Sequence, residues 1–143
     1  FFRSMMLPVP GESDLLPLLV CGAHLEGMPL HHQLQDRGAQ LREKTTTTND
    51  YRLYALPGGA RPGLVQASEG EAGVPIQVEV YLIPSVHVGS FLAGIPHPLG
   101  LGKVQVASGE MVTGFICAQN GLAGAEDISS YGGWRAYKAA QGQ

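Results

Sequence analysis

The sequence has few charged residues, no run of basic residues and no long apolar segment. Charged residues make up 15% of its 143 residues, and the net charge is −3. Proteins that bind nucleic acid cluster Lys and Arg against the phosphates, so no nucleic-acid partner is expected. The longest apolar run, residues 15–23, contains Pro17 and is too short to cross a bilayer. No typical secretion signal accompanies it, so the sequence predicts a cytoplasmic protein without a membrane partner.

Cysteine occurs only twice, which limits both disulfide and metal chemistry. Cys21 and Cys117 each lie in an apolar run, and this predicts two buried free thiols. No pair of cysteines has the spacing of a zinc site, and His87 and His97 lack ligand spacing to any partner. The phosphate-binding motif GxxxxGK[ST], the GxSxG motif and the Ser/Lys amidase signature are also absent. The sequence therefore predicts neither a metal nor a cofactor.

Glycine and proline are plentiful and spread along the chain, with 20 and 10 residues respectively. This distribution predicts many turns between short strands. Residues 74–82 alternate between apolar and polar side chains, so Ile76, Val78 and Val80 are expected to face the core. Short helices are predicted near 30–37 and 85–94, and a hairpin is predicted around Ser108-Gly109. The predicted fold class is α+β, a small, mainly antiparallel β-barrel with short helices.

The first 14 residues differ in character from the rest of the chain. Residues 1–14 contain two prolines and a glycine without periodicity, which predicts a tail or linker, partly of cloning origin. Residues 15–143 suit a single domain with one core. Such a lightly charged surface is typical of a domain that another domain or subunit partly covers.

A glycine turn follows the first buried strand at Gly22-Ala23-His24-Leu25. Glycine lets the backbone turn sharply, so that consecutive N–H groups point into one concavity and can bind an anion. The His24 imidazole on this loop could act as a base or as a hydrogen-bond donor. The alternative is that His24 only braces the loop through a hydrogen bond to a neighbouring carbonyl.

Four further residues are candidates for substrate binding, each with a structural alternative. Arg135 could clamp a carboxylate with its planar fork, or form a surface ion pair with Glu126 or Asp127. Glu79 lies opposite the apolar row of its strand. It could orient substrate or His24 inside a cavity, or face water, which the pattern slightly favours. The hydroxyls of Tyr51 and Tyr81 could line a pocket, although strand tyrosines are commonly half-buried structural residues.

Three strings of residues resemble the allophanate hydrolase C-terminal domain, a branch of the gamma-glutamyl cyclotransferase-like superfamily. They are GAHLEGMPL, FLAGIPHPLG and GAEDISSYGGWRAY, and the resemblance extends over residues 18–137. Cyclotransferases carry a catalytic glutamate at the end of the helix that follows the VEVY-type strand. Here no Asp or Glu occurs between Glu79 and Glu110. Cyclotransferase chemistry is therefore not expected, although the fold is shared.

The resemblance implies a part in urea breakdown, beside an amidase domain of the same polypeptide. That amidase converts allophanate to N-carboxycarbamate, and the C-terminal domain is proposed to decarboxylate it. The implied roles are proton handling for His24 and substrate binding for the other candidates: Gly22, Ala23, Leu25, Tyr51, Tyr81, Glu79 and Arg135. The implied ligand is a small dicarboxylate, and a homodimer is expected. The alternative is a non-catalytic module for assembly and dimerisation.

Overall fold

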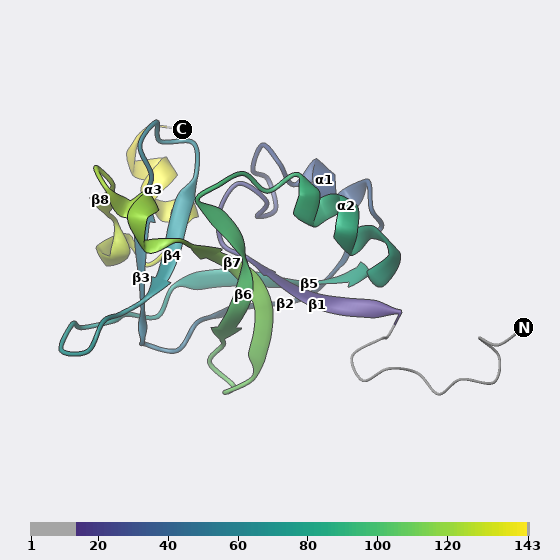
Figure 1. Cartoon of the computed structure of the whole chain (residues 1–143), viewed down its shortest axis with the longest axis horizontal. Helices are drawn as coiled ribbons and strands as arrows, with labels where there is room; N and C mark the ends of the chain where they lie inside the picture. Colours follow the sequence, from purple (N-terminus) through teal and green to yellow (C-terminus); the bar gives the residue numbers. More distant parts are fainter. Residues whose placement is uncertain (1–13, 143) are drawn as a thin grey trace, which may run out of the picture.

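The structure is a computed structural model that describes residues 14–142. It combines eight strands with short helices in a mixed α+β fold (Figure 1). The strands are β1 (Leu15–Val20), β2 (Gln40–Thr46), β3 (Tyr51–Ala55), β4 (Pro62–Gln66), β5 (Gln77–Pro84), β6 (Leu99–Gln105), β7 (Met111–Cys117) and β8 (Glu126–Asp127). The α-helices and 3-10 turns are α1 (His32–Gln35), η2 (Ser85–His87), α2 (Val88–Ala93), η3 (Gln119–Leu122), η4 (Ser129–Tyr131) and α3 (Trp134–Ala140).

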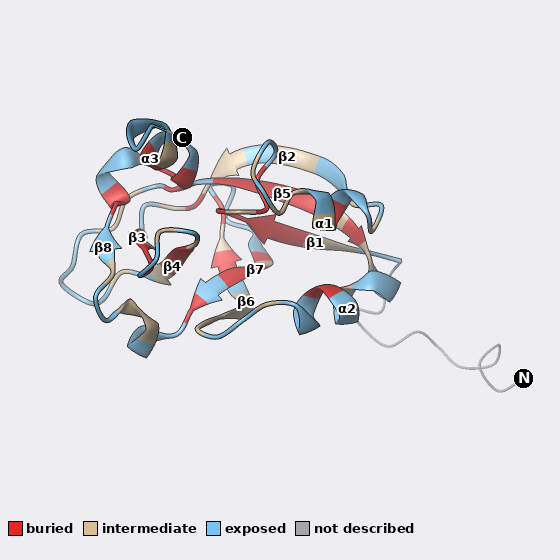
Figure 2. Ribbon diagram, turned by 90° about the horizontal axis from the view of Figure 1, so that it is seen from above, coloured by how far each residue is buried: buried red, intermediate tan, exposed pale blue. Residues whose placement is uncertain are grey.

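The strands form two sheets, one of five strands in the order β2-β5-β1-β7-β6 and one of three in the order β4-β3-β8. Neighbouring strands are antiparallel except for β1 and β7, which are parallel. Helices α1 and α2 lie at one end of the large sheet, and α3 lies with the small sheet at the other (Figures 1 and 2). The predicted short helices and the predicted hairpin are confirmed.

The predicted barrel is not confirmed, because the large sheet does not close along its length in the described residues. Its edge strands β2 and β6 meet through a single bridge, from Thr47 to Val106. Beyond this bridge the chain enters the β6–β7 turn, where the Gly109 N–H donates to the Val106 carbonyl at 2.8 Å. Strand β6 ends as it reaches β2, so a continuous ladder between them cannot form.

Strand β5 lies between β1 and β2 and is buried on both faces (Figure 2). Ile76, Val78 and Val80 are at most 2% exposed, which confirms the predicted apolar row. The opposite face was expected to meet water at Glu79, and this expectation is wrong, since Glu79 is 1% exposed. The loop after β1 and helix α3 cover that face and supply hydrogen bonds to the carboxylate.

Both cysteines are buried free thiols, as predicted. None of the helices between residues 14 and 142 has the length and apolar character needed to cross a membrane. The same residues contain no cluster of three or more histidine, cysteine or acidic side chains that could hold a metal ion. The predicted tail, residues 1–14, lies almost entirely outside the described residues.

Candidate functional site

The loop between β1 and α1 separates two pockets. Within the loop, the Leu25 N–H donates to the Gly22 carbonyl at 3.0 Å, and the Leu30 N–H donates to the Ala23 carbonyl at 2.8 Å. Gly22, Ala23 and His24 line one pocket, while Leu25 lines the other. The structure therefore divides the predicted site residues between two places on either side of one loop.

The first pocket, here called the His24 pocket, is a cavity of about 50 Å³. The loop, α1, the start of β4 and the end of α2 converge on it. Its lining residues are Cys21, Gly22, Ala23, His24, Leu30, Gln33, Arg61, Pro62, Gly94, Ile95, Pro96, Leu99 and Phe115.

Neighbouring side chains hold the His24 imidazole on three sides, and the residue is only 8% exposed. Its Nε2 lies 2.7 Å from Oε1 of the Gln33 side-chain amide. The ring stacks on Phe115, with centroids 5.0 Å apart, and packs against Phe91 at 5.1 Å. Because the Gln33 oxygen can only accept, this contact favours the tautomer with hydrogen on Nε2, leaving Nδ1 as an acceptor.

Burial lowers the pKa of His24 below its ordinary value of 6.5, because charge is costly in this apolar surrounding. The hydrogen bond to Gln33 raises the pKa in part, while the positive charge of Arg37 and the imidazoles of His31 and His32 lower it further. His24 is therefore a neutral imidazole at neutral pH, able to accept a proton through Nδ1.

The lowered pKa of His24 makes stability depend on pH. As pH falls through 6.5, the unfolded chain binds a proton at this position before the folded chain does, so stability decreases as pH falls. Lowering the pH from 7.5 to 5.5 should lower the Tm of the wild type more than that of His24→Gln, whose side chain at this position cannot titrate. Thermal unfolding curves of both proteins at the two pH values measure this difference. Parallel Tm curves for the two proteins would contradict a depressed His24 pKa.

Several donors around the His24 pocket have no partner among the described residues. In the part of the chain that the structure describes, the N–H groups of Gly22, Ala23 and His24 donate to no other protein atom. The Arg61 guanidinium likewise forms no hydrogen bond or ion pair with a described residue. Gly22 and His24 are buried, whereas Ala23 is partly buried. Buried backbone N–H groups are nearly always paired, with water or ligand where protein is lacking. Three unpaired donors beside an unpaired cation suit a small anion.

Arg61 and Gln33 were not among the residues singled out in the sequence. Arg61 follows the turn after β3, and nothing in its local pattern links it to the loop at Gly22. The link is spatial, since the Pro62 ring packs so close to Gly22 that a Cβ there would lie 2.4 Å from Pro62 Cδ. Gly22 is thus required by this close approach, which also brings Arg61 to the pocket.

Among its other described lining residues, the His24 pocket contains no acid or reactive nucleophile that could act on a substrate. The sequence predicted that the catalytic glutamate of cyclotransferases is missing at the end of the helix after β5. Gly94, Ile95 and Pro96 follow α2 there and line the pocket. Burial raises the pKa of the Cys21 thiol to about 12, so it stays protonated and unreactive. His24 is therefore the residue in this pocket best suited to move a proton.

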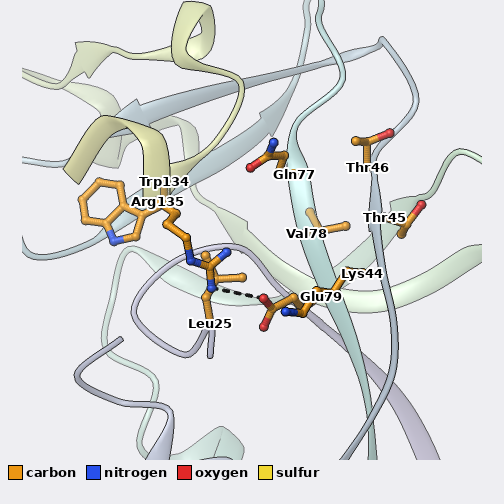
Figure 3. Close-up of a pocket in the computed structure, with 9 residues that line it drawn as sticks. All are labelled: Leu25, Lys44, Thr45, Thr46, Gln77, Val78, Glu79, Trp134 and Arg135. Atoms are coloured by element: carbon orange, nitrogen blue, oxygen red, sulfur yellow. Dashed lines mark hydrogen bonds and ion pairs between the residues drawn. The ribbon is translucent and has the colours of Figure 1, made fainter. Parts of the chain in front are cut away.

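The second pocket, here called the Glu79 cleft, has a volume of about 370 Å³. Strands β2 and β5 form its floor, and α3 and Leu25 form its walls (Figure 3). Its lining residues are Leu25, Lys44, Thr45, Thr46, Gln77, Val78, Glu79, Trp134 and Arg135.

The Glu79 carboxylate is buried beside the cleft with donors on both oxygens. Oε1 accepts from the Glu26 N–H at 2.9 Å and from the Tyr81 hydroxyl at 2.8 Å. Oε2 accepts from Arg135 Nη2 at 3.2 Å. Burial alone raises the pKa of Glu79, but these three donors together hold its pKa below the ordinary value of 4.5. Glu79 is therefore ionised at neutral pH.

The ion pair of Arg135 differs from the one considered in the sequence. Its partner is Glu79, and the same Nη2 also donates to the Glu26 carbonyl at 2.7 Å. Asp127, one of the partners considered, instead pairs with Arg52 at 2.6 Å. Arg135 and Glu79 thus lie together, but in the cleft rather than beside His24.

The two tyrosines lie in the core and line neither of these pockets. The Tyr51 hydroxyl accepts from the Gln105 N–H at 2.9 Å, which ties β3 to β6. The Tyr81 hydroxyl donates to Glu79. Burial and the neighbouring Glu79 carboxylate raise the pKa of Tyr81, so it stays a neutral donor. Contact of either tyrosine with substrate remains a prediction.

These features define a small α+β domain of the gamma-glutamyl cyclotransferase-like fold, with a loop suited to an anion beside a neutral histidine. Residues 16–139 match the model of the allophanate hydrolase C-terminal domain. The chain therefore belongs to that family.

Relatives of this chain are mostly much longer proteins. A urea amidolyase from Lachancea kluyveri is 43% identical over 135 residues, covering 91% of this chain and 7% of that protein. An allophanate hydrolase from Kluyveromyces lactis is 42% identical with a TM-score of 0.85, covering 93% of this chain and 22% of that one. A uropathogenic E. coli-specific protein is 26% identical with a TM-score of 0.82, covering 89% of this chain and 98% of that one. The domain thus occurs both within large proteins and as most of a small one.

Proposed function

We propose that the domain decarboxylates N-carboxycarbamate, the product of an amidase domain in the same polypeptide, and that the reaction takes place in the His24 pocket. The observation that carries this proposal is the set of unpaired donors there. Among residues 14–142, the N–H groups of Gly22, Ala23 and His24 find no protein partner, and neither does the Arg61 guanidinium. The family and the urea amidolyase relatives support the substrate class.

The chemistry needs a grip on one carboxylate and a proton for nitrogen. N-carboxycarbamate carries two carboxylates on one nitrogen. When the C–N bond breaks, one of them leaves as neutral carbon dioxide and the bonding electrons stay on nitrogen, which takes up one proton to give carbamate. Arg61 and the loop N–H groups hold the retained carboxylate. His24 takes a proton from solvent on Nδ1 and delivers it to the nitrogen.

Binding of malonate, a dicarboxylate of similar shape, tests the location of the site. Malonate should shift the backbone N–H signals of Ala23 and His24 in an NMR titration. Arg61→Gln should weaken this response at least about tenfold, because a charge-assisted hydrogen bond is lost. Arg42→Gln is the matched control, since Arg42 pairs with Glu110 on the surface and should leave the response unchanged. Equal affinity in wild type and Arg61→Gln would contradict the assignment.

A second candidate function is a non-catalytic module for assembly and dimerisation. It is favoured by exposed apolar side chains on the η2–α2 segment, where Val86 is 83% and Leu92 is 47% exposed. In that case Val86→Asp should abolish self-association in sedimentation experiments, and malonate should leave the Ala23 and His24 signals unmoved.

A further inference from the structure

We propose that the Glu79 cleft is a second, separate binding site for small carboxylate anions, in which the free N–H groups of Arg135, on Nε and Nη1, bind the carboxylate and Lys44 assists. This site lies on the opposite side of the loop from the His24 pocket and shares no lining residue with it. It does not depend on the function proposed for that pocket.

The floor of the cleft consists of three cross-strand pairs of β2 and β5. Lys44 lies opposite Glu79, and Thr46 lies opposite Gln77. Because side chains alternate along a strand, these two pairs share one face of the sheet, whereas the intervening pair points to the other. The shared face bears four polar side chains under a cleft of about 370 Å³, large enough for a small organic anion.

The buried carboxylate of Glu79 fixes Arg135 at the wall of this cleft. Figure 3 shows the Arg135 side chain reaching from α3 towards Glu79 on β5. Nη2 makes both contacts, to Glu79 and to the Glu26 carbonyl. Within the described residues, Nε and Nη1 have no protein acceptor, and the side chain remains 44% exposed. An arginine fixed through Nη2 keeps its Nε–H and Nη1–H groups, and each of them can donate a single charge-assisted hydrogen bond to a carboxylate.

The hydrogen-bonding groups of the cleft that remain available to a ligand are mainly donors. Both oxygens of Glu79 already accept, so the buried acceptor is satisfied. Lys44 uses its ammonium only in an exposed pair with Glu26, at 3.2 Å, which is weak and can yield to a ligand. The Thr46 hydroxyl donates to no described residue. A ligand that only accepts, such as a carboxylate, complements this set, whereas a cation would find no free carboxylate.

An NMR titration with malonate and acetate tests the site directly. Both anions should shift the Trp134 indole N–H and the Thr46 amide signals. Lys44→Gln should weaken the response about 2- to 5-fold, and Arg135→Gln should weaken it at least about tenfold. Arg42→Gln, which removes a nearby cation that pairs with Glu110, should leave it unchanged.

The two pockets can be distinguished within the same titration. Arg61→Gln should alter only the signals of Ala23 and His24, and Lys44→Gln only those of the cleft. Because Lys44→Gln leaves the Glu79–Arg135 pair intact, it remains informative if Arg135→Gln unfolds the protein. The proposal would be overturned if the Trp134 indole and Thr46 amide signals did not shift at malonate concentrations that saturate the His24 pocket. It would also be overturned if the response of these signals were the same in wild type and Lys44→Gln.

Discussion

Glu79→Ala should lower the free energy of unfolding by about 3 kcal/mol, the largest loss expected from one polar side chain in this domain. The change removes the acceptor of three donors and leaves the Glu26 N–H and the Tyr81 hydroxyl without partners beneath α3. A buried donor without an acceptor costs about 1–3 kcal/mol. Arg135 adds less, since it is 44% exposed and can regain water.

Urea unfolding followed by fluorescence measures this loss, because the sole tryptophan, Trp134, is buried at the same place. Glu79→Gln keeps an acceptor oxygen and should lose roughly half as much. As the pH falls, Glu79→Gln should also lose less stability than the wild type, because glutamine does not titrate. The lowered pKa of Glu79 means that the unfolded chain takes up its proton first as pH falls through about 4.5.

Glu43→Ala on strand β2 provides the control for Glu79→Ala. Glu43 contacts Arg42 only at 3.9 Å and its side chain is 40% exposed, so the change should cost less than about 0.5 kcal/mol. If Glu79→Ala were as mild as Glu43→Ala, the carboxylate would not hold the loop and α3 together.

The alternation of residues 76–80 was sufficient to predict which side of β5 carries the apolar core, since a strand has a period of two. The burial of Glu79 could not be predicted in that way. Its partners lie 53 and 56 residues away, at Glu26 and Arg135, and no local pattern records their approach. A polar residue opposite an apolar row is ordinarily solvated, unless distant segments cover it.

The candidate site was predictable to a similar extent. A glycine after a buried strand indicated the turn at Gly22 and hence the unpaired N–H groups. Arg61 and Gln33 have no sequence signature, because the packing of β4 and α1 against the loop brings them to the His24 pocket. Local sequence patterns also could not predict whether the large sheet closes into a barrel. Closure depends on how far β2 and β6 run side by side, which a turn at Gly109 cuts short.

His24→Ala should reduce decarboxylation of N-carboxycarbamate by about 10²- to 10⁴-fold, the usual contribution of a positioned proton-transfer group. The substrate can be formed from allophanate by a separate amidase, and carbon dioxide release can then be followed. The rate without the domain gives the spontaneous background. His24→Gln should lose as much activity as His24→Ala, since an amide cannot carry the proton at neutral pH.

Gln33→Ala separates proton transfer from bracing of the loop. It removes the 2.7 Å contact with Nε2 but keeps the imidazole and its stacking on Phe115. If His24 transfers the proton, Gln33→Ala should retain most of the activity that His24→Ala loses. If His24 only braces the loop, both changes should lower stability by about 1–3 kcal/mol and affect decarboxylation alike. Unchanged malonate binding and turnover in His24→Ala, together with a lowered Tm, would rule out the proton-transfer role.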